Sequence, residues 1–140
     1  MAVARIESLA HGPHGIARID GKVHFVRGAA PGDEVEVEVE EDHAKFAYAR
    51  VTRVLTEGPV RRAAPCPYLP RCGGCPWQHV EYAAQAAAKQ ESVRDLLSRT
   101  GGIDASVVRP IVPASSEYGY RRRLSLRVAE REVGFLAAAS

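Results

Sequence analysis

The sequence lacks any apolar run that approaches the length needed to span a bilayer. Its first residues, Met-Ala-Val-Ala-Arg-Ile-Glu, also lack the basic start and apolar stretch of a secretory signal. We therefore expect a soluble cytoplasmic protein with no membrane partner. A net charge of +2 is too small to indicate nucleic acid by itself. The charge is uneven, however, because residues 1–58 carry net −3 and residues 59–140 carry net +5, which favours an anionic partner for the second half.

Cysteine is scarce, and all three cysteines lie between Cys66 and Cys75. An odd number leaves one thiol outside any disulfide, and intracellular thiols are usually reduced. The surrounding prolines and the Gly-Gly pair disfavour helix and strand, so neither a core position nor a redox motif after a strand fits well. Thiolates are soft metal ligands, and a Cys-x-x-Cys loop can direct two sulfurs at one ion. The pattern predicts a metal site made by Cys66, Cys72 and Cys75.

The identity of the metal stays open on spacing alone. Zinc sites normally close with four ligands, and His79, four positions after Cys75, would complete a Cys3His set. An iron–sulfur cluster usually takes four cysteines, and the chain has three.

Residues 1–57 are predicted to form a small OB-like β-barrel of five short strands. Residues 15–26 form a hairpin pattern around Asp20-Gly21, a two-residue turn. Residues 34–40 alternate Glu and Val, which places the valines inward and the glutamates outward. Residues 46–55 supply a last long strand. Barrels of this kind often bind oligonucleotides.

Residues 58–79 read as a linker and Cys-rich metal loop, and residues 80–140 as a helix plus a β-hairpin that starts an α/β or α+β central domain. The helix is expected over residues 80–100, which are rich in alanine and end before Gly101-Gly102. Tyr82, Ala86, Val93 and Leu97 share its predicted packing face. Strands are expected at 107–112, at 120–128 and at 133–136, the last two forming the hairpin.

Exposed cations and aromatic side chains are the candidates for RNA contact. Arginines can bind phosphate in two-pronged fashion, each neutralised phosphate adds salt-sensitive affinity, and tyrosines can stack on unpaired bases. The candidate RNA-binding residues are Arg61, Arg62, Tyr120, Arg121, Arg122 and Arg123. On the barrel, the expected RNA side is the one that bears Arg18, Lys22, Arg27, Arg50 and Arg53.

The stretch from Arg61 to Pro67, with Cys72-Gly-Gly-Cys75 and Gln78-His79, resembles the RNA uracil-5-methyltransferases that carry a TRAM domain and a four-iron four-sulfur cluster. Residues 12–17 and 26–33 look like the TRAM domain of that family. Residues 85–89 and 120–123 look like the entry to its central domain.

The resemblance implies that Cys66, Cys72 and Cys75 bind a four-iron four-sulfur cluster whose fourth cysteine comes from further down the chain. The complete enzyme would transfer a methyl group from S-adenosylmethionine to carbon 5 of a uridine in tRNA or rRNA. Its catalytic domain would follow Ser140, so no catalytic residue is expected in this chain and a C-terminal methyltransferase domain is the missing partner. The alternative is a non-enzymatic RNA-binding module with a Cys3His zinc site that includes His79.

Overall fold

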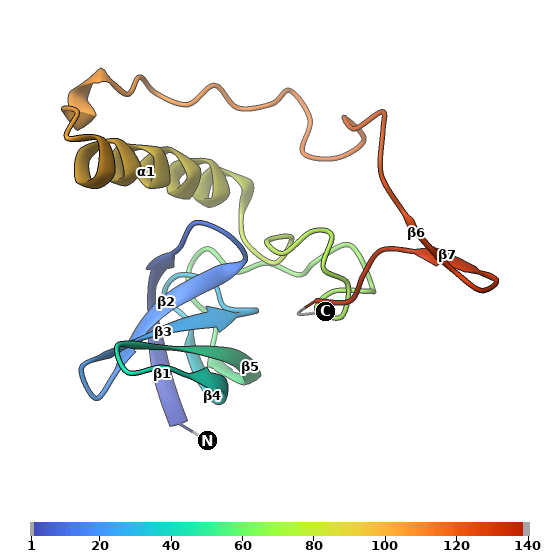
Figure 1. Cartoon of the computed structure of the whole chain (residues 1–140), viewed down its shortest axis with the longest axis horizontal. Helices are drawn as coiled ribbons and strands as arrows, with labels where there is room; N and C mark the ends of the chain where they lie inside the picture. Colours follow the sequence, from blue (N-terminus) through green and yellow to red (C-terminus); the bar gives the residue numbers. More distant parts are fainter. Residues whose placement is uncertain (1, 139–140) are drawn as a thin grey trace.

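The computed structural model describes residues 2–138, so the outermost ends of the predicted segments 1–57 and 80–140 lie outside the described residues. The N-terminal part is a closed barrel in the order β1-β2-β3-β5-β4, with β3 and β5 parallel and the other pairs antiparallel (Figure 1). The strands are β1 (Ala2–Leu9), β2 (His14–Ile19), β3 (Lys22–Arg27), β4 (Glu34–Asp42) and β5 (Phe46–Thr56). The predicted five-stranded barrel is confirmed.

The β2–β3 hairpin turns at the predicted dipeptide. Asp20 and Gly21 both have positive φ, 51° and 78°, and Ile19 pairs with Lys22 across the turn. Positive φ at both central residues is the requirement of the turn that matches strand twist, and Asp-Gly meets it at low cost.

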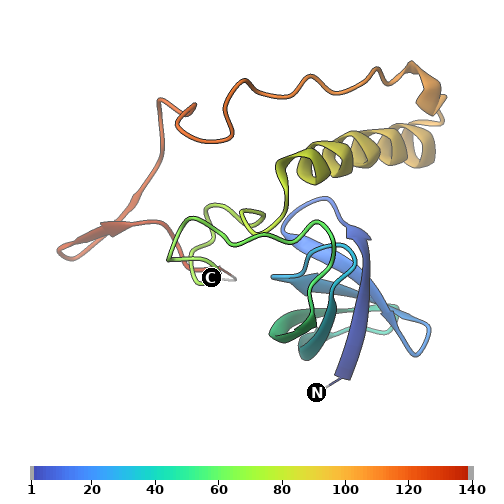
Figure 2. The same ribbon diagram turned by 180° about the vertical axis from the view of Figure 1, so that it is seen from behind.

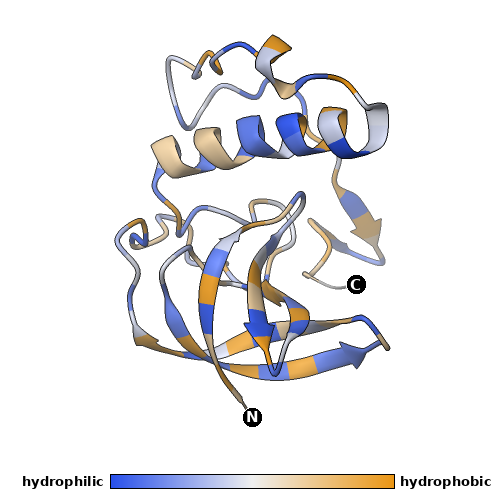
Figure 3. Ribbon diagram, turned by 90° about the vertical axis from the view of Figure 1, so that its left-hand side faces the viewer, coloured by the Kyte–Doolittle hydropathy of each residue, from blue (hydrophilic) through white to orange (hydrophobic). Residues whose placement is uncertain are grey.

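The barrel core is made of small and branched aliphatic side chains. Its buried members are Ala4, Ile6, Ala17, Val26, Ala29, Val35, Val37 and Ala49. The alternation of hydrophobic and hydrophilic residues along the strands is visible in Figure 3. The predicted burial of the β4 valines holds for Val35 and Val37 but is wrong for Val39, which is 45% exposed. Among the described residues β1 pairs with β4 only over residues 34–37, so Val39 has no pairing partner in the described part of β1.

Helix α1 (Tyr82–Gly101) ends where Gly102 adopts φ 61° and donates its N–H to the Leu97 carbonyl, so the predicted glycine stop is confirmed. Its predicted packing face is wrong. The helix meets the second hydrophobic cluster, which contains Trp77 and Val80, through Ala84 and Ala88. Small side chains let the helix approach closely, whereas Val93 on the opposite face is 48% exposed.

The segment that follows α1 runs along the side of the helix that faces away from the barrel (Figures 1 and 2). Gln90 accepts a hydrogen bond from the Ile111 N–H (2.6 Å), and the Tyr82 hydroxyl accepts one from the Ala114 N–H (2.8 Å). The predicted apolar face of α1 is therefore turned toward this segment.

The predicted strand at 107–112 is wrong, because the chain forms the short 3-10 helix η1 (Ala105–Val107) and then continues without strand pairing. The predicted strand at 120–128 shrinks to β6 (Arg127–Ala129), which pairs with β7 (Glu132–Gly134). Strand structure needs a paired neighbour, and within residues 2–138 the stretch 108–126 has none. None of the helices in the described part combines the length and apolar character needed to cross a bilayer.

Candidate RNA interface and thiol loop

The three cysteines lie on an irregular loop between the barrel and α1. All three are free; Cys66 and Cys72 are half-buried and Cys75 is exposed. The loop is closed by hydrogen bonds from the Leu69 N–H to the Cys66 carbonyl (3.3 Å) and from the Cys72 N–H to the Tyr68 carbonyl (2.9 Å). The Gly74 N–H also donates to the Cys72 sulfur at 3.4 Å.

The thiol loop, residues 66–75, is joined to the C-terminal end of the described chain. The Gly73 N–H donates to the Leu136 carbonyl (3.0 Å), and the Ala138 N–H donates to the Arg71 carbonyl (2.8 Å). A side chain at Gly73 would place its Cβ 3.3 Å from the carbonyl oxygens of Leu136 and Ala137, so this close backbone approach favours glycine. A segment more than 60 residues away in sequence thus forms one wall beside the thiols.

The donor set of the thiol loop fits a thiophilic metal, because three free thiols share ten residues. Residues 2–138 contain no group of three His, Cys, Asp or Glu side chains already gathered to hold an ion. A cluster that uses these thiols would draw them together in the loop.

His79 contacts the barrel and is not gathered with the cysteines into a ligand group among residues 2–138. Its ring is buried, and Nε2 lies 3.1 Å from the Ala29 carbonyl of the barrel. Burial lowers the pKa of His79; the nearby Arg61 also lowers it, while the Ala29 carbonyl and Asp33 oppose the shift. The neutral ring is thus a packing element of the barrel–linker junction, and the structure does not bring it to the cysteines as the Cys3His zinc prediction requires.

Asp33 fixes the linker to the barrel. Its fully buried carboxylate accepts hydrogen bonds from the N–H groups of Ala30 (2.6 Å) and Gly58 (2.8 Å). The Arg61 guanidinium donates to it through Nε at 3.0 Å and Nη2 at 2.6 Å, and Nη2 also reaches the Gly28 carbonyl at 2.8 Å. Burial alone would raise the pKa of Asp33, but the hydrogen bonds from Arg61, Gly58 and Ala30 outweigh it and the pKa is lowered. We call this set of contacts the Asp33 latch.

Arg61 and Arg62 are therefore not the free phosphate ligands that the sequence predicts. Arg61 is committed to the latch, with a side chain only 12% exposed. Arg62 donates to the Gln78 carbonyl (3.1 Å) and pairs with Glu117 at 2.9 Å. Both guanidiniums hold the linker against its neighbours, which the sequence does not reveal because the partners are distant along the chain.

The predicted basic cluster at 120–123 is open to solvent. Tyr120 is 63% exposed, and Arg121, Arg122 and Arg123 are also exposed. Across residues 2–138, none of these three arginines takes part in an ion pair. Uncompensated cations of this kind are the ones that can gain energy from phosphate.

The cations on the barrel are mostly compensated. Four of the five predicted RNA-facing cations have carboxylate partners; the pairs are Arg18–Glu7, Lys22–Asp42, Arg27–Glu40 and Arg50–Glu38. Arg53 is exposed and unpaired among the described residues. The barrel side thus offers little net positive charge to a phosphate backbone.

Sequence reasoning missed a cluster of rings on the outside of the barrel, which we call the aromatic face: His14, Phe25, His43, Phe46 and Tyr48. The signal is present in β5, where Phe46 and Tyr48 alternate with the buried Ala47 and Ala49. Hydrophobicity alone would place the large rings of β5 inside the barrel. The narrow barrel has room only for the alanines of this strand, so the rings lie outside.

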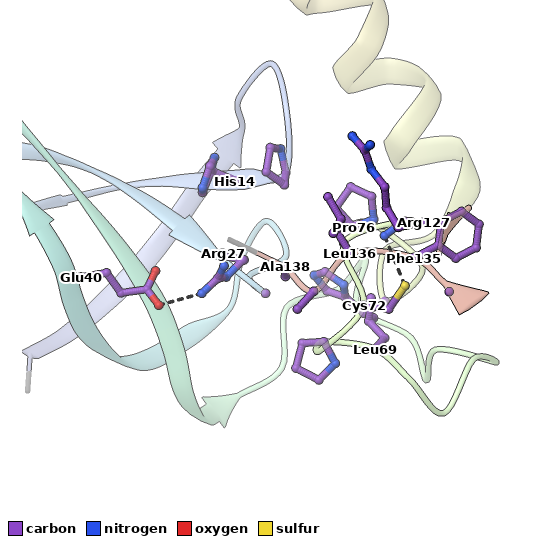
Figure 4. Close-up of a pocket in the computed structure, with 18 of the residues that line it drawn as sticks. His14, Arg27, Glu40, Leu69, Cys72, Pro76, Arg127, Phe135, Leu136 and Ala138 are labelled. Atoms are coloured by element: carbon purple, nitrogen blue, oxygen red, sulfur yellow. Dashed lines mark hydrogen bonds and ion pairs between the residues drawn. The ribbon is translucent and has the colours of Figure 1, made fainter. Parts of the chain in front are cut away.

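A cleft of about 860 Å³ separates the barrel from the thiol loop. His14, Arg27 and Glu40 line it from the barrel side, and Cys72 and Leu136 lie on the opposite wall (Figure 4). The cleft is thus the place where the barrel, the thiol loop and the C-terminal segment meet.

Comparison with known proteins identifies the barrel and extends the similarity to the rest of the chain. Residues 4–52 match the TRAM domain model. The chain is 43% identical over 136 residues to a 23S rRNA (uracil(1939)-C(5))-methyltransferase RlmD of Thiobacillus denitrificans, with 96% of this chain and 31% of the relative covered. It is 38% identical over 130 residues to an RNA methyltransferase of Aquifex aeolicus that is described as uncharacterized, with 93% of this chain and 31% of the relative covered.

The crystal structure of a tRNA (uracil-54, C5)-methyltransferase of Pyrococcus abyssi, in complex with S-adenosyl-L-homocysteine, superposes with a TM-score of 0.60 and 25% identity, covering 94% of this chain and 28% of that one. The chain thus spans about 30% of the length of the relatives that it matches. Its barrel is a TRAM domain, and over the part that it spans the chain is similar to RNA methyltransferases.

Proposed function

We propose that the chain is the RNA-binding, cluster-holding portion of an RNA uracil-C5 methyltransferase that acts on tRNA or rRNA in the cytoplasm. The proposal is supported by the combination of a TRAM barrel with an adjoining loop of three free thiols. The chain is also similar to RNA methyltransferases over nearly its whole length. The methyl group would come from S-adenosylmethionine, bound by parts of the enzyme that this chain does not match.

The RNA backbone would be bound first by the exposed basic cluster. Among residues 2–138, Arg121, Arg122 and Arg123 have no ion-pair partner, and the exposed Tyr120 beside them is available for stacking. Phosphate contacts position a protein on RNA without reading its sequence. This cluster therefore supplies affinity rather than choice of uridine.

The test of RNA binding is a fluorescence anisotropy titration with a labelled uridine-containing RNA hairpin over a series of salt concentrations. Replacing Arg121, Arg122 and Arg123 together by Gln should flatten the slope of log K against log salt by about 2, since each lost single-strand phosphate contact removes roughly 0.7.

A matched control with the same charge change replaces three other arginines by Gln: Arg5 on β1, and Arg94 and Arg99 on α1. These residues lie away from the cluster. The control should leave the slope nearly unchanged. Equal slopes for the wild type and the Arg121–Arg123 variant, or no RNA binding by the wild type, would contradict the proposal.

The thiol loop would hold an iron–sulfur cluster through Cys66, Cys72 and Cys75, with a fourth thiolate from a part of the enzyme outside this chain. Three observations support this: the thiols are free, the Gly74 N–H already faces the Cys72 sulfur, and the loop is bonded to residues 136–138. The cluster would serve as a structural clamp, since it sits where the barrel and the C-terminal segment meet.

A further inference from the structure

The largest side chains of the barrel lie on its outside. Phe25 on β3 and Phe46 and Tyr48 on β5 point outward, whereas their strand neighbours Val26 and Ala47 are fully buried. Large aromatic side chains usually supply much of the buried apolar area of a small domain. Here they are placed on the surface although the core is built from Ala, Val and Ile. Contiguous apolar side chains on a surface often mark an interaction site.

The rings form one continuous array. Tyr48 lies at the centre, with its ring centroid 5.3 Å from His14, 5.5 Å from Phe25 and 5.6 Å from Phe46. His43 extends the array at 4.6 Å from Phe46. The registers explain the grouping, because Phe25 is paired directly with Tyr48 across the parallel β3–β5 ladder. Packing between the rings limits their motion and so reduces the ordering cost of binding a further flat ring.

Charge around the aromatic face is close to balanced. Arg27 is paired with Glu40, and Arg50 is paired with Glu38, both beside the rings. On the same end of β4, Asp42 is paired with Lys22, and Glu41 lies 3.5 Å from the His43 ring. A surface with this balance does not attract a phosphate backbone strongly, so any nucleic acid bound here would be held by its bases.

The aromatic face leads into the cleft beside the thiol loop. His14 and Tyr48 belong to both surfaces, and Arg27 also lines the cleft. Across the cleft lie Pro70 and Pro76 of the Cys-rich stretch, and Figure 4 shows the barrel and loop residues on facing sides. The volume of about 860 Å³ lies within the usual range of small-ligand sites, about 300–1,000 Å³. A base stacked on Tyr48 would therefore have room for its neighbour inside the cleft.

We propose that the aromatic face is a stacking site for unpaired bases, which directs a single-stranded stretch of RNA into the cleft between the barrel and the thiol loop. The inference rests on the proposed RNA-binding function and adds the form of RNA, single-stranded rather than duplex. Paired bases already stack on one another inside a helix, whereas unpaired bases expose their faces to aromatic side chains. The balanced charge argues for contacts that depend little on salt.

The test is binding of a single-stranded oligouridine of about ten nucleotides, with an RNA duplex of matched length as competitor. Tyr48→Leu, which keeps apolar volume but removes the flat ring, should weaken binding of the single strand by roughly tenfold. Tyr48→Trp should restore it. The matched control is Tyr82→Leu on α1, outside the residues that line the cleft, which should change the affinity less than twofold. Thermal unfolding of each variant shows whether its fold is retained.

The salt dependence of RNA binding distinguishes this site from the basic cluster. Tyr48→Leu should weaken RNA binding by the same factor at low and at high salt. The Arg121–Arg123 variant, in contrast, should bind with a weaker dependence on salt. As a second measurement that needs no variant, 2-aminopurine within the oligouridine should be quenched when it stacks on the wild-type protein.

The outcomes separate the two proposals. Binding by the wild type with the arginine-dependent salt slope, but with unchanged affinity in Tyr48→Leu and no quenching, would overturn the stacking site alone. Absence of RNA binding by the wild type would overturn both. A wild-type dimer that Tyr48→Leu dissociates would show that the face binds a second protein copy, and the stacking site would be wrong.

Discussion

The Asp33 latch makes the sharpest prediction about what holds the linker to the barrel. In Asp33→Asn the shape of the side chain is kept but its charge is lost. The Arg61 guanidinium, whose side chain is 12% exposed, then has no charged partner. An amide nitrogen also replaces one of the oxygens that accept from Ala30 and Gly58.

The expected loss follows from removing one partner of a buried ion pair, which costs about 3–5 kcal/mol. Small proteins have about 5–15 kcal/mol of total stability, so this single change removes a large share. For a chain of 140 residues it corresponds to a fall in Tm on the order of 10–20 °C. The double variant Asp33→Asn, Arg61→Met should recover at least half of the loss, because it no longer buries an unpaired charge.

The assay is urea unfolding followed by circular dichroism, with Glu7→Gln as the control. That change breaks the exposed Arg18–Glu7 pair and should cost less than about 1 kcal/mol. Because the pKa of Asp33 is lowered from 3.8, its contribution is present above about pH 4 and is lost as the pH falls further. The difference in unfolding free energy between the wild type and Asp33→Asn should therefore become smaller only below pH 4. A difference in unfolding free energy of less than 1 kcal/mol between the wild type and Asp33→Asn at neutral pH would show that the Asp33–Arg61 pair contributes little to stability.

Three further predictions test the junction around the latch. Gly58→Ala should destabilise by about 2–3 kcal/mol in urea unfolding, because its Cβ would lie 2.3 Å from the Pro31 carbonyl oxygen; Gly134→Ala, which meets nothing within 4 Å, is the control and should be nearly neutral. The lowered pKa of His79 means that the unfolded state binds more protons, so stability should fall as the pH drops below about 6.5, by at most about 1.4 kcal/mol per pH unit. His79→Gln should flatten that dependence in urea titrations at several pH values, and an unchanged slope would contradict the burial of a neutral ring. Gly73→Ala should loosen the contact between the thiol loop and residues 136–138, which faster amide exchange at position 73 and at Ala138 would report; protection equal to wild type would count against the close approach.

Local patterns predict the regular elements well. The Asp20-Gly21 turn and the alternation in β4 define the barrel, and Gly102 marks the end of α1, because each depends on neighbouring residues only. The failures depend on contacts between distant segments. Val39 is exposed and has no pairing partner in the described part of β1, and the stretch 108–126 forms no strand because no described neighbour pairs with it.

The candidate site is only partly visible in the sequence. The three clustered cysteines can be recognised from their spacing, and the Arg121–Arg123 run from its charge. Asp33 reads as a turn residue and Arg61 as a linker cation, and nothing in the sequence pairs residues 28 positions apart. The aromatic face is hidden for another reason: period-two alternation shows that Phe46 and Tyr48 share a side, but the width of the barrel decides which side it is.

The proposed metal centre of the thiol loop lies between the barrel and the C-terminal segment. It is tested most directly by measuring iron and acid-labile sulfide in protein purified without oxygen, for the wild type and for Cys66→Ser, Cys72→Ser and Cys75→Ser. We expect iron and sulfide in matching amounts in the wild type, with loss of both in each variant. Stoichiometric zinc without sulfide, or iron that persists in all three variants, would contradict it.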